Sequence, residues 1–550
     1  MKEHMASEQS APSRIDAVSG RVMDFLEKIS GSYRLFIALY FVIAVLITVV
    51  LLRTGPVVIT RYGHDVPVYM DCAWRVLNGQ LPHADFQSIL GALFFLILAA
   101  GMKLGGVSVW GIISATLMMF WLFSLWTWIL AVRRLSAPLA FLYALAVGLF
   151  ITGAYHLGLD YRATTYANLY NRYGYAMLFV ILLDLFFPPR KEDTRQDFTG
   201  GLSTGFLLVC LLFIKVNFFT AACALLVIRA VIARPSGGWA AGFAAGLAGA
   251  LVPMALFFRF DFTPVLRDYQ MVTLVRGRSL FSDPAFVMEK MGPFALSFML
   301  LPVYLILFSG FTFQPRGKIG SPSRVFALMA AVFLCGILLN LTNHGFYDMP
   351  MLLPLVFLPF EYFLLKPDHS REFLAVSALS ILLIFLIITG SFYGKNVASI
   401  GFASANKKKA AGALTAIRSD ALGALYVAFA DGTFNKDYPE KLNEGLDLLK
   451  RHAREHDRIA TLDFENPFPV GLGLMSPKGF YSICNFGVDF NNEHYIMPER
   501  AFHDTTLVMV PRPGCPESTL PLLRIYGSYI EKHFDFVEST ERWMLLRKKP

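Results

Sequence analysis

The stretch RYGHDVPVYMDCAWRVLNG, residues 61–79, decides the fold because of what precedes it, the wholly apolar run LFIALYFVIAVLITVVLL at 35–52. Eighteen apolar residues are long enough to cross a bilayer as a helix. The stretch then places His64, Asp65 and Asp71 just beyond the end of that span. Ionisable side chains are unfavourable at the edge of the hydrocarbon, so they are expected to face water or a partner. This juxtaposition predicts a polar site at a membrane surface.

Composition places the chain among polytopic α-helical membrane proteins. Of its 550 residues, 55% are hydrophobic and 16% are charged, whereas a soluble protein carries about 25% charged residues. The net charge of +9 fits basic cytoplasmic loops better than nucleic-acid binding. The polar segment 1–33 has no short apolar stretch with a cleavage site, so we expect a cytoplasmic N-terminal segment and no signal peptide.

The apolar runs predict about eleven spans. They fall at about 35–53, 108–132, 137–154, 174–188, 199–214, 217–233, 238–258, 292–312, 325–342, 350–365 and 373–391. Short basic segments follow every second span, and placing them with the N-terminus in the cytoplasm satisfies the positive-inside rule. This orientation puts the remaining polar segments on the outer face: 54–107, 155–173, 259–291, 343–349 and 392–550.

One apolar run does not fit this alternation. The segment ILGALFFLILAAGMKLGG, 89–106, is long enough to cross, but crossing there would put Arg133 and Arg134 outside. We therefore expect a helix that lies in the outer interface. The alternative is a true span, with another pair miscounted. The runs 199–214 and 217–233 are the ambiguous pair, because only Lys215 and its neighbours separate them.

The chain accordingly divides into the segment 1–33, a membrane domain at 34–392 with a large first outer loop at 54–107, and a C-terminal part at 393–550. Strand-like and helix-like patterns alternate in the C-terminal part, which predicts a small extracytoplasmic α/β domain. If it lies outside the cytoplasm, Cys484 and Cys515 have the option of a disulfide.

Acidic and basic residues gather near span ends on the predicted outer face. They are Asp65, Asp71, Asp85, His156, Asp160, Arg162, Asn171, Arg172, Lys215, Arg259, Asp261, Arg276, Arg278, Asn343, His344 and Asp348. Carboxylates suit a general base that deprotonates an acceptor hydroxyl, and Arg and Lys suit a phosphate leaving group. Both together fit a substrate with a lipid tail and a charged head. The sequence has no P-loop and no HExxH motif, so an ATP-driven pump and a zinc protease are unsupported.

The first loop resembles that of the GT-C integral-membrane glycosyltransferases. Asp65, Tyr69 and Gly79, followed by LPHADF at 81–86 and GALFFLILAAGMKLGG at 91–106, are similar to that family's pattern of an acid after the first span, a turn and an interfacial helix. The resemblance implies transfer of a sugar from a polyprenyl-phosphate donor to a lipid or glycan acceptor of the cell envelope. It also implies an inverting reaction at the outer face of the cytoplasmic membrane.

The same resemblance implies roles for individual residues. Asp65 matches the catalytic acid, and Asp85 matches the second acid of the first loop. The resemblance also places Asp160, Arg162, Arg172, Lys215 and His344 among the substrate-binding candidates, at acceptor or phosphate positions. Arg276 and Arg278 join these candidates as basic residues of the predicted outer face. His83 stands where the family usually has an aromatic residue, and SILGAL at 88–93 replaces a proline-rich segment.

Other interpretations stay open on the sequence alone. Asp65 could merely cap a helix that starts near Pro67. A divalent cation shared by Asp65, Asp85 and Asp160 is possible in principle, and no cofactor is required by the pattern. The rival function is a transporter or flippase for an envelope lipid, which should carry charges near the bilayer midplane and often a repeated half. Here the charges lie at span ends and no repeat is visible.

Overall fold

The computed structural model describes residues 32–187, 189, 194–232, 234–282, 322–343, 348–365, 371–410, 414–428 and 437–550. Three predicted features lie outside the described residues: most of the segment 1–33, the span at 292–312, and His344. The side chain of Arg278 lies outside them as well.

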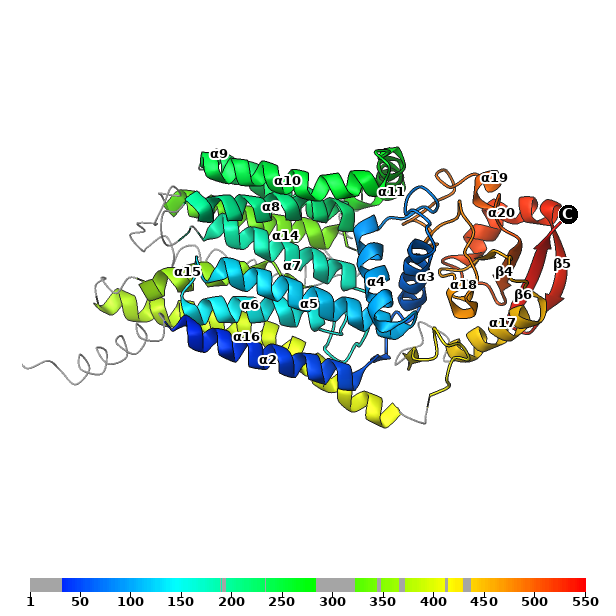
Figure 1. Cartoon of the computed structure of the whole chain (residues 1–550), viewed down its shortest axis with the longest axis horizontal. Coiled ribbons are helices and arrows are strands. Elements are labelled where there is room, and N and C mark those ends of the chain that lie inside the picture. Colours follow the sequence, from blue (N-terminus) through cyan, green and yellow to red (C-terminus); the bar gives the residue numbers. More distant parts are fainter. Residues whose placement is uncertain are drawn as a thin grey trace, which may run out of the picture.

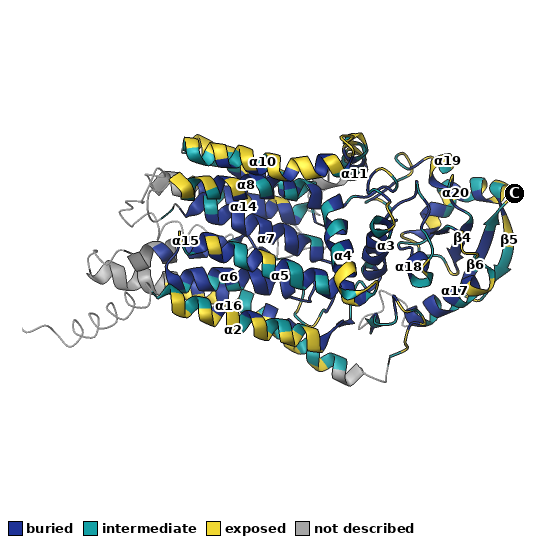
Figure 2. Ribbon diagram, viewed as in Figure 1, coloured by how far each residue is buried: buried dark blue, intermediate teal, exposed yellow. Residues whose placement is uncertain are grey.

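Long helices lie side by side along the longest axis of the molecule and form a bundle (Figure 1). They are α2 (Tyr33–Thr54), α5 (Val109–Ala131), α6 (Ala137–Thr152), α7 (Leu169–Phe186), α8 (Thr194–Ile214), α9 (Val216–Ile232), α10 (Gly237–Phe257), α14 (Pro322–Leu341), α15 (Leu352–Leu365) and α16 (Arg371–Ala410). Apolar side chains on α2 and α10 remain exposed, as Figure 2 shows, and this is the pattern expected of helices that face lipid.

Within the described residues, five helices are long and apolar enough to cross a membrane by length and composition. These are Tyr33–Thr54, Val109–Ala131, Thr194–Ile214, Gly237–Phe257 and the portion Leu382–Lys407 of α16. The other predicted spans in the described part coincide with shorter helices, so the total of about eleven remains a prediction. The runs around Lys215 form two separate helices, α8 and α9.

Small residues bring α8 and α10 into close contact. A Cβ added at Gly201 would lie 2.1 Å from the carbonyl oxygen of Trp239, and one added at Gly242 would lie 2.1 Å from that of Phe198. Only glycine lets the two backbones approach this closely. The pair therefore uses the small-residue packing typical of helices in membranes.

Three helices lie across the end of the bundle where the predicted outer loops gather: α3 (Asp65–Leu77), α4 (Ala92–Gly105) and α11 (Thr263–Ser282) (Figure 1). The orientation of α4 agrees with the expectation that 89–106 lies along the surface. Its start is held to the end of α8, since Gly91 N donates to Ile214 O at 2.9 Å.

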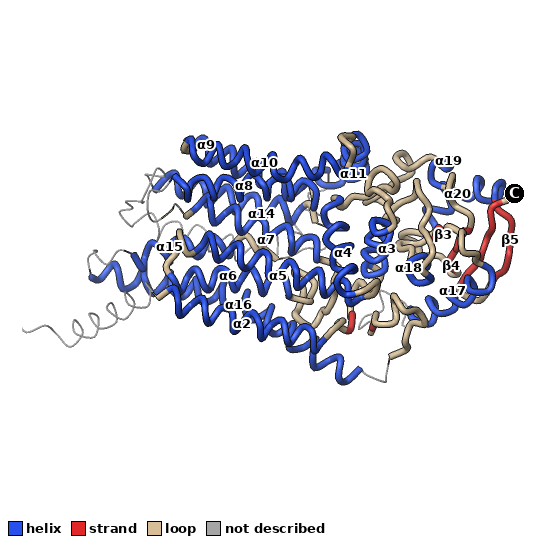
Figure 3. Tube along the Cα trace, viewed as in Figure 1, coloured by secondary structure: helices blue, strands red, loops and turns tan. Residues whose placement is uncertain are grey.

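Residues 437–550 form a C-terminal α/β unit beyond these transverse helices (Figure 3). Its sheet has the order β3 (Ile459–Thr461), β4 (Leu507–Pro511), β6 (Trp543–Lys548), β5 (Phe534–Ser539), with β3 parallel to β4 and the other pairs antiparallel. Its helices are α17 (Tyr438–His452), α18 (Phe468–Leu472), α19 (Pro498–Ala501) and α20 (Thr519–His533). Cys484 and Cys515 are free thiols.

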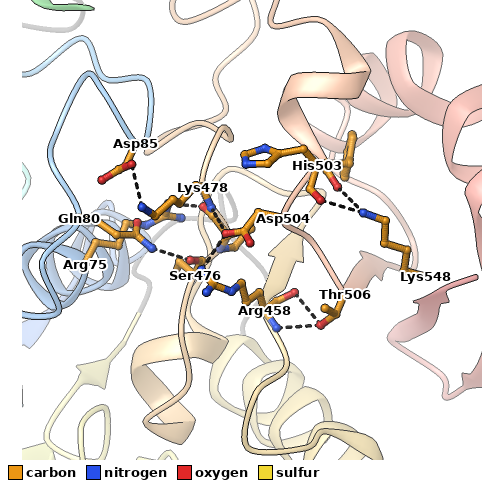
Figure 4. A network of polar contacts seen from close by, with 12 residues as sticks. Arg75, Gln80, Asp85, Arg458, Ser476, Lys478, His503, Asp504, Thr506 and Lys548 are labelled. Atoms are coloured by element: carbon orange, nitrogen blue, oxygen red, sulfur yellow. Dashed lines mark hydrogen bonds and ion pairs between the residues drawn. The ribbon is translucent and has the colours of Figure 1, made fainter. Parts of the chain in front are cut away.

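The C-terminal unit is attached to the first loop by several buried contacts (Figure 4). Arg75 Nε binds Asp71 Oδ2 at 2.7 Å, and its Nη1 donates to Pro477 O at 2.9 Å. Gln80 Nε2 donates to Ser476 O at 2.8 Å. These last two bonds join residues about 400 positions apart in the sequence.

The connection between the bundle and this unit departs from the predicted boundary in one respect. Helix α16 continues to Ala410, so the boundary predicted at 392/393 falls inside a helix. Beyond it, β2 (Tyr426–Val427) pairs in parallel with β1 (Val58–Ile59), which follows α2. Both ends of the membrane domain thus converge beside the first loop.

Candidate active site

Asp65 is the first residue of α3, directly beyond the loop that follows α2. The N-cap position belongs to His64, so the structure places Asp65 in the first helical turn rather than at the cap. Its side chain is 21% exposed, and Oδ1 lies 3.3 Å from His64 Nε2. A helix N-terminus favours the ionised carboxylate, but burial outweighs this and raises the pKa of Asp65 to about 8.

His64 is a neutral neighbour of this acid. Burial lowers the pKa of His64 to about 3, although the charge of Asp463 opposes the shift. Its ring also packs edge-on against Phe464, with centroids 4.2 Å apart. A neutral imidazole leaves the proton affinity of Asp65 high, as a general base that works near neutral pH requires.

A buried lysine occupies the break between α8 and α9. Lys215 is 8% exposed, and Nζ donates to the side-chain oxygens of Asn343 and Asn171, the latter at 3.5 Å. Nζ also lies 4.7 Å from the centroid of the Tyr170 ring. Amide oxygens solvate an ammonium group without neutralising its charge, and no ion pair with Lys215 occurs among the described residues. A buried, unneutralised cation is a candidate anion site.

A second cation lies near the first. Arg276, on α11, acts electrostatically on Lys215, on Tyr170 and on Asp489 of the C-terminal unit. Two neighbouring positive charges repel each other, and an anion bound between them would relieve that repulsion. Burial raises the pKa of Asp489 to about 7, against the opposing effect of Arg276, so this acid is only partly ionised near neutral pH.

Tyr170 connects the acid to the cations. Its hydroxyl feels the charges of both Asp65 and Arg276, and its ring lies under the ammonium group of Lys215. The neighbouring Tyr69, one turn after Asp65 on α3, packs edge-on against Tyr170 with centroids 6.5 Å apart. The acid and both cations therefore occupy one region at the end of the bundle.

Other predicted site residues have different neighbours. Arg172 is buried and donates to Phe150 O at 2.6 Å and to Tyr155 O at 2.7 Å, which fixes the end of α6 to the following loop. Asp160 and Arg162 lie 3.8 Å apart, with side chains 63% and 68% exposed. The structure does not bring these three residues into contact with Asp65.

Asp85 lies at the junction with the C-terminal unit. Its Oδ1 pairs with Lys478 Nζ at 3.1 Å, and its Oδ2 accepts from Leu81 N at 2.8 Å (Figure 4). Among the residues that the structure describes, no three His, Cys, Asp or Glu side chains gather in a way that could hold a metal ion. Asp65, Asp85 and Asp160 thus do not form a shared cation site there.

The sequence reasoning missed two acids of the C-terminal unit. Glu465 and Asp489 are both buried, and the charge of Asp65 acts on Glu465. The available signal was the segment TLDFENPF at 461–468, where acids directly follow a predicted strand. Loops at strand ends commonly carry functional residues.

Comparison with known proteins bears on the fold. No protein-family model and no curated protein sequence matches the chain. The structure is similar to ArnT from Cupriavidus metallidurans with undecaprenyl phosphate bound, with a TM-score of 0.50 and 11% identity over 93% of this chain and 97% of that one. It also matches the arabinofuranosyltransferase AftD from Mycobacteria, with a TM-score of 0.40 and 13% identity over 93% of this chain and 40% of AftD. The chain therefore shares the fold of ArnT.

Proposed function

We propose that the chain transfers a sugar from a polyprenyl-phosphate donor to an acceptor of the cell envelope, at the outer face of the cytoplasmic membrane. The observation that carries the proposal is that Lys215 lies over the ring of Tyr170, while the charges of Arg276 and Asp65 both act on the same tyrosine. The similarity to a structure that holds undecaprenyl phosphate supports a lipid phosphate as the anion.

In this mechanism the phosphate of the donor lies against Lys215 and Arg276. Asp65 takes the proton of the acceptor hydroxyl as its oxygen attacks the anomeric carbon. The bond between that carbon and the phosphate oxygen breaks, and the cations stabilise the charge that develops on the departing phosphate. Attack opposite the leaving group inverts the anomeric centre.

The position of the charges favours an enzyme over a flippase. A flippase is expected to carry polar sites near the bilayer midplane, whereas Asp65 begins the transverse helix α3 and Arg276 lies on the transverse helix α11. Lys215 directly follows α8, whose last residue accepts a hydrogen bond from Gly91 at the start of the transverse helix α4. The outer location follows from the predicted cytoplasmic N-terminus. A reporter fused after Pro550 should accordingly be active outside the cytoplasm and inactive within it.

The decisive experiment combines Asp65→Asn with a binding measurement. Purified protein in lipid nanodiscs is titrated with undecaprenyl phosphate, and membranes are assayed for transfer from radiolabelled undecaprenyl-phosphate sugars. Loss of a general base predicts a decrease of about 10²–10⁴-fold in transfer, with lipid binding retained. Asp535→Asn, in an exposed pair with Lys549, is the matched control. Wild-type transfer by Asp65→Asn would contradict the assignment.

A further inference from the structure

A buried carboxyl of the C-terminal unit, Glu465, lies within electrostatic range of Asp65 and lacks a full set of hydrogen-bond partners among the described residues. Glu465 is 7% exposed, and its Oε1 accepts a hydrogen bond from the Tyr438 hydroxyl at 2.6 Å. Its Oε2 is buried and has no hydrogen-bond partner among the described residues. An unsatisfied buried carboxyl oxygen is unfavourable for folding, so a ligand that bonds it would offset that penalty.

The position of Glu465 relative to Asp65 follows from the segment around it. Phe464 packs its ring against His64, the residue before Asp65. The charge of Asp65 acts on Glu465 and on Tyr438. Neither contact involves Lys215 or Arg276, which approach Asp65 through Tyr170. Phe464, Glu465 and Tyr438 of the C-terminal unit therefore border Asp65 through contacts other than those that connect it to the proposed phosphate site.

The geometry of an in-line displacement indicates which substrate these residues would contact. The leaving phosphate and the attacking oxygen lie on opposite sides of the sugar, and the base lies with the attacking oxygen. The groups that adjoin Asp65 away from the cations are then the groups that meet the acceptor. On the proposed function, on which this step rests, Glu465 and Tyr438 belong to the acceptor side.

The chemistry of that side restricts the acceptor. Glu465 lies near Asp65 there, and the charge of Asp463 is paired with that of Lys441 at 3.1 Å. The carboxyl oxygens of Glu465 suit an acceptor that offers hydroxyl groups. A phosphate oxygen is also already ionised and has no need of a base, whereas a hydroxyl must lose its proton.

We infer that the acceptor is a neutral, hydroxyl-bearing saccharide, and that Glu465 of the C-terminal unit binds it beside Asp65. Burial raises the pKa of Glu465 well above its usual range, although the hydrogen bond from Tyr438 opposes the shift. A protonated carboxyl can donate one hydrogen bond and accept another, as a sugar hydroxyl requires. The new bond is therefore a glycoside, with a carbon–oxygen–carbon linkage.

The linkage can be tested without knowing the acceptor. Membranes from the organism that makes the chain are incubated with undecaprenyl phosphate carrying labelled glucose, galactose or arabinose. Residual donor is extracted, and the product is treated with mild acid, which cleaves glycosyl phosphates and leaves glycosides intact. Label that resists the acid supports the inference. Label that is released would overturn it while leaving the proposed function in place.

Variants at Glu465 test the residue itself. Glu465→Leu should lower transfer at limiting acceptor at least about 10-fold, while the affinity for undecaprenyl phosphate stays within about twofold. Glu465→Gln keeps a donor and an acceptor and should stay within about threefold of wild type. Glu444→Gln, in a pair with Arg542 on the same unit, is the matched control.

The outcomes separate the two proposals. Equal losses of transfer and lipid binding in Glu465→Leu would mark a merely structural residue and overturn the assignment, as would unchanged transfer. Wild-type protein that binds no undecaprenyl phosphate would instead refute the proposed function. Retained binding with a selective loss of transfer supports both.

Discussion

Asp85 Oδ1 of the first loop lies 3.1 Å from Lys478 Nζ of the C-terminal unit. The two residues are almost 400 positions apart, and their pairing helps to hold the C-terminal unit over the transverse helices (Figure 4). The resemblance to glycosyltransferases assigned Asp85 to substrate binding. The ion pair instead suggests that Asp85 holds the C-terminal unit against the first loop. The two roles lead to different predictions.

A charge exchange distinguishes these roles. Asp85→Lys should place two ammonium groups together and lower the melting temperature, and the double variant Asp85→Lys/Lys478→Asp should restore it. The pair is partly exposed, so we expect an effect of about 1 kcal/mol or less. Thermal unfolding in detergent measures docking, and sugar transfer measures substrate binding. A double variant that regains stability but not transfer would support a substrate-binding role for Asp85.

Lys215 is expected to bind the lipid phosphate. Replacing it with Met keeps most of the length of the side chain and removes the charge, so affinity for undecaprenyl phosphate should decrease at least about 30-fold, or about 2 kcal/mol. Thermal stability should not decrease much, because the buried charge has no ionic partner to lose among the described residues. Lys395→Met, in a half-exposed pair with Asp348, is the control and should leave affinity unchanged. Equal affinities of Lys215→Met and wild type for undecaprenyl phosphate would contradict the assignment of Lys215 to the phosphate site.

The raised pKa of Asp65 predicts the pH dependence of transfer. The carboxylate is the active form of a base, so kcat/KM should increase about tenfold per pH unit below about pH 8 and level off above it. Initial rates at limiting substrate between about pH 5.5 and about pH 9.5 measure this profile. A flat profile across this range would contradict the assignment of Asp65 as the base.

The same shift affects stability with the opposite sign. An unfolded Asp has a pKa near about 3.9, so the folded protein holds the Asp65 proton more tightly than the unfolded chain does. The stabilising contribution is complete below about pH 4 and is lost as the pH rises through about 8. Asp65→Asn should flatten this part of the stability profile, as measured by thermal unfolding across that range.

Arg75 is predicted to be a structural residue of the docking surface. Arg75→Met would leave Asp71 buried without its cation, which typically costs about 3–5 kcal/mol. It would also remove the hydrogen bond to Pro477 O. Limited proteolysis should then release the C-terminal unit more readily. The double variant Asp71→Asn/Arg75→Met should recover part of the loss, and an unchanged cleavage rate in the single variant would contradict the role.

Much of the architecture could be predicted from hydrophobic patterning. The helix at 92–105 lies across the end of the bundle, and the sequence predicted this, since a crossing there would have inverted every later basic loop. A single basic residue between two apolar runs is unfavourable in the hydrocarbon unless it serves a site, so the pattern pointed to Lys215. Both features could be predicted because they depend only on the hydrophobicity and charge of neighbouring residues in the sequence.

The contacts of individual polar residues could not be predicted in this way. Arg172 stands one position from Asn171, which bonds Lys215, yet its guanidinium points to Tyr155 O. A shift of one helical position rotates a side chain by about 100°. The charge of Asp65 acts on Glu465 only because a unit about 400 residues later folds back toward the first loop, and no periodicity in the sequence encodes that approach.

Helix α16 contains 40 residues and so extends about 60 Å, roughly twice the thickness of a bilayer's hydrocarbon core. Lys407 Nζ, near its end, donates to Thr54 O at the end of α2, at 2.6 Å. The length of α16 therefore determines where, along the axis of the bundle, the chain turns back toward β2. Adding about four residues to it would shift its end by about 6 Å and rotate it by about 40°. Strand β2 would then lose its register with Val58 and Ile59. Glu465, which follows β2 in the chain, would be displaced relative to Asp65.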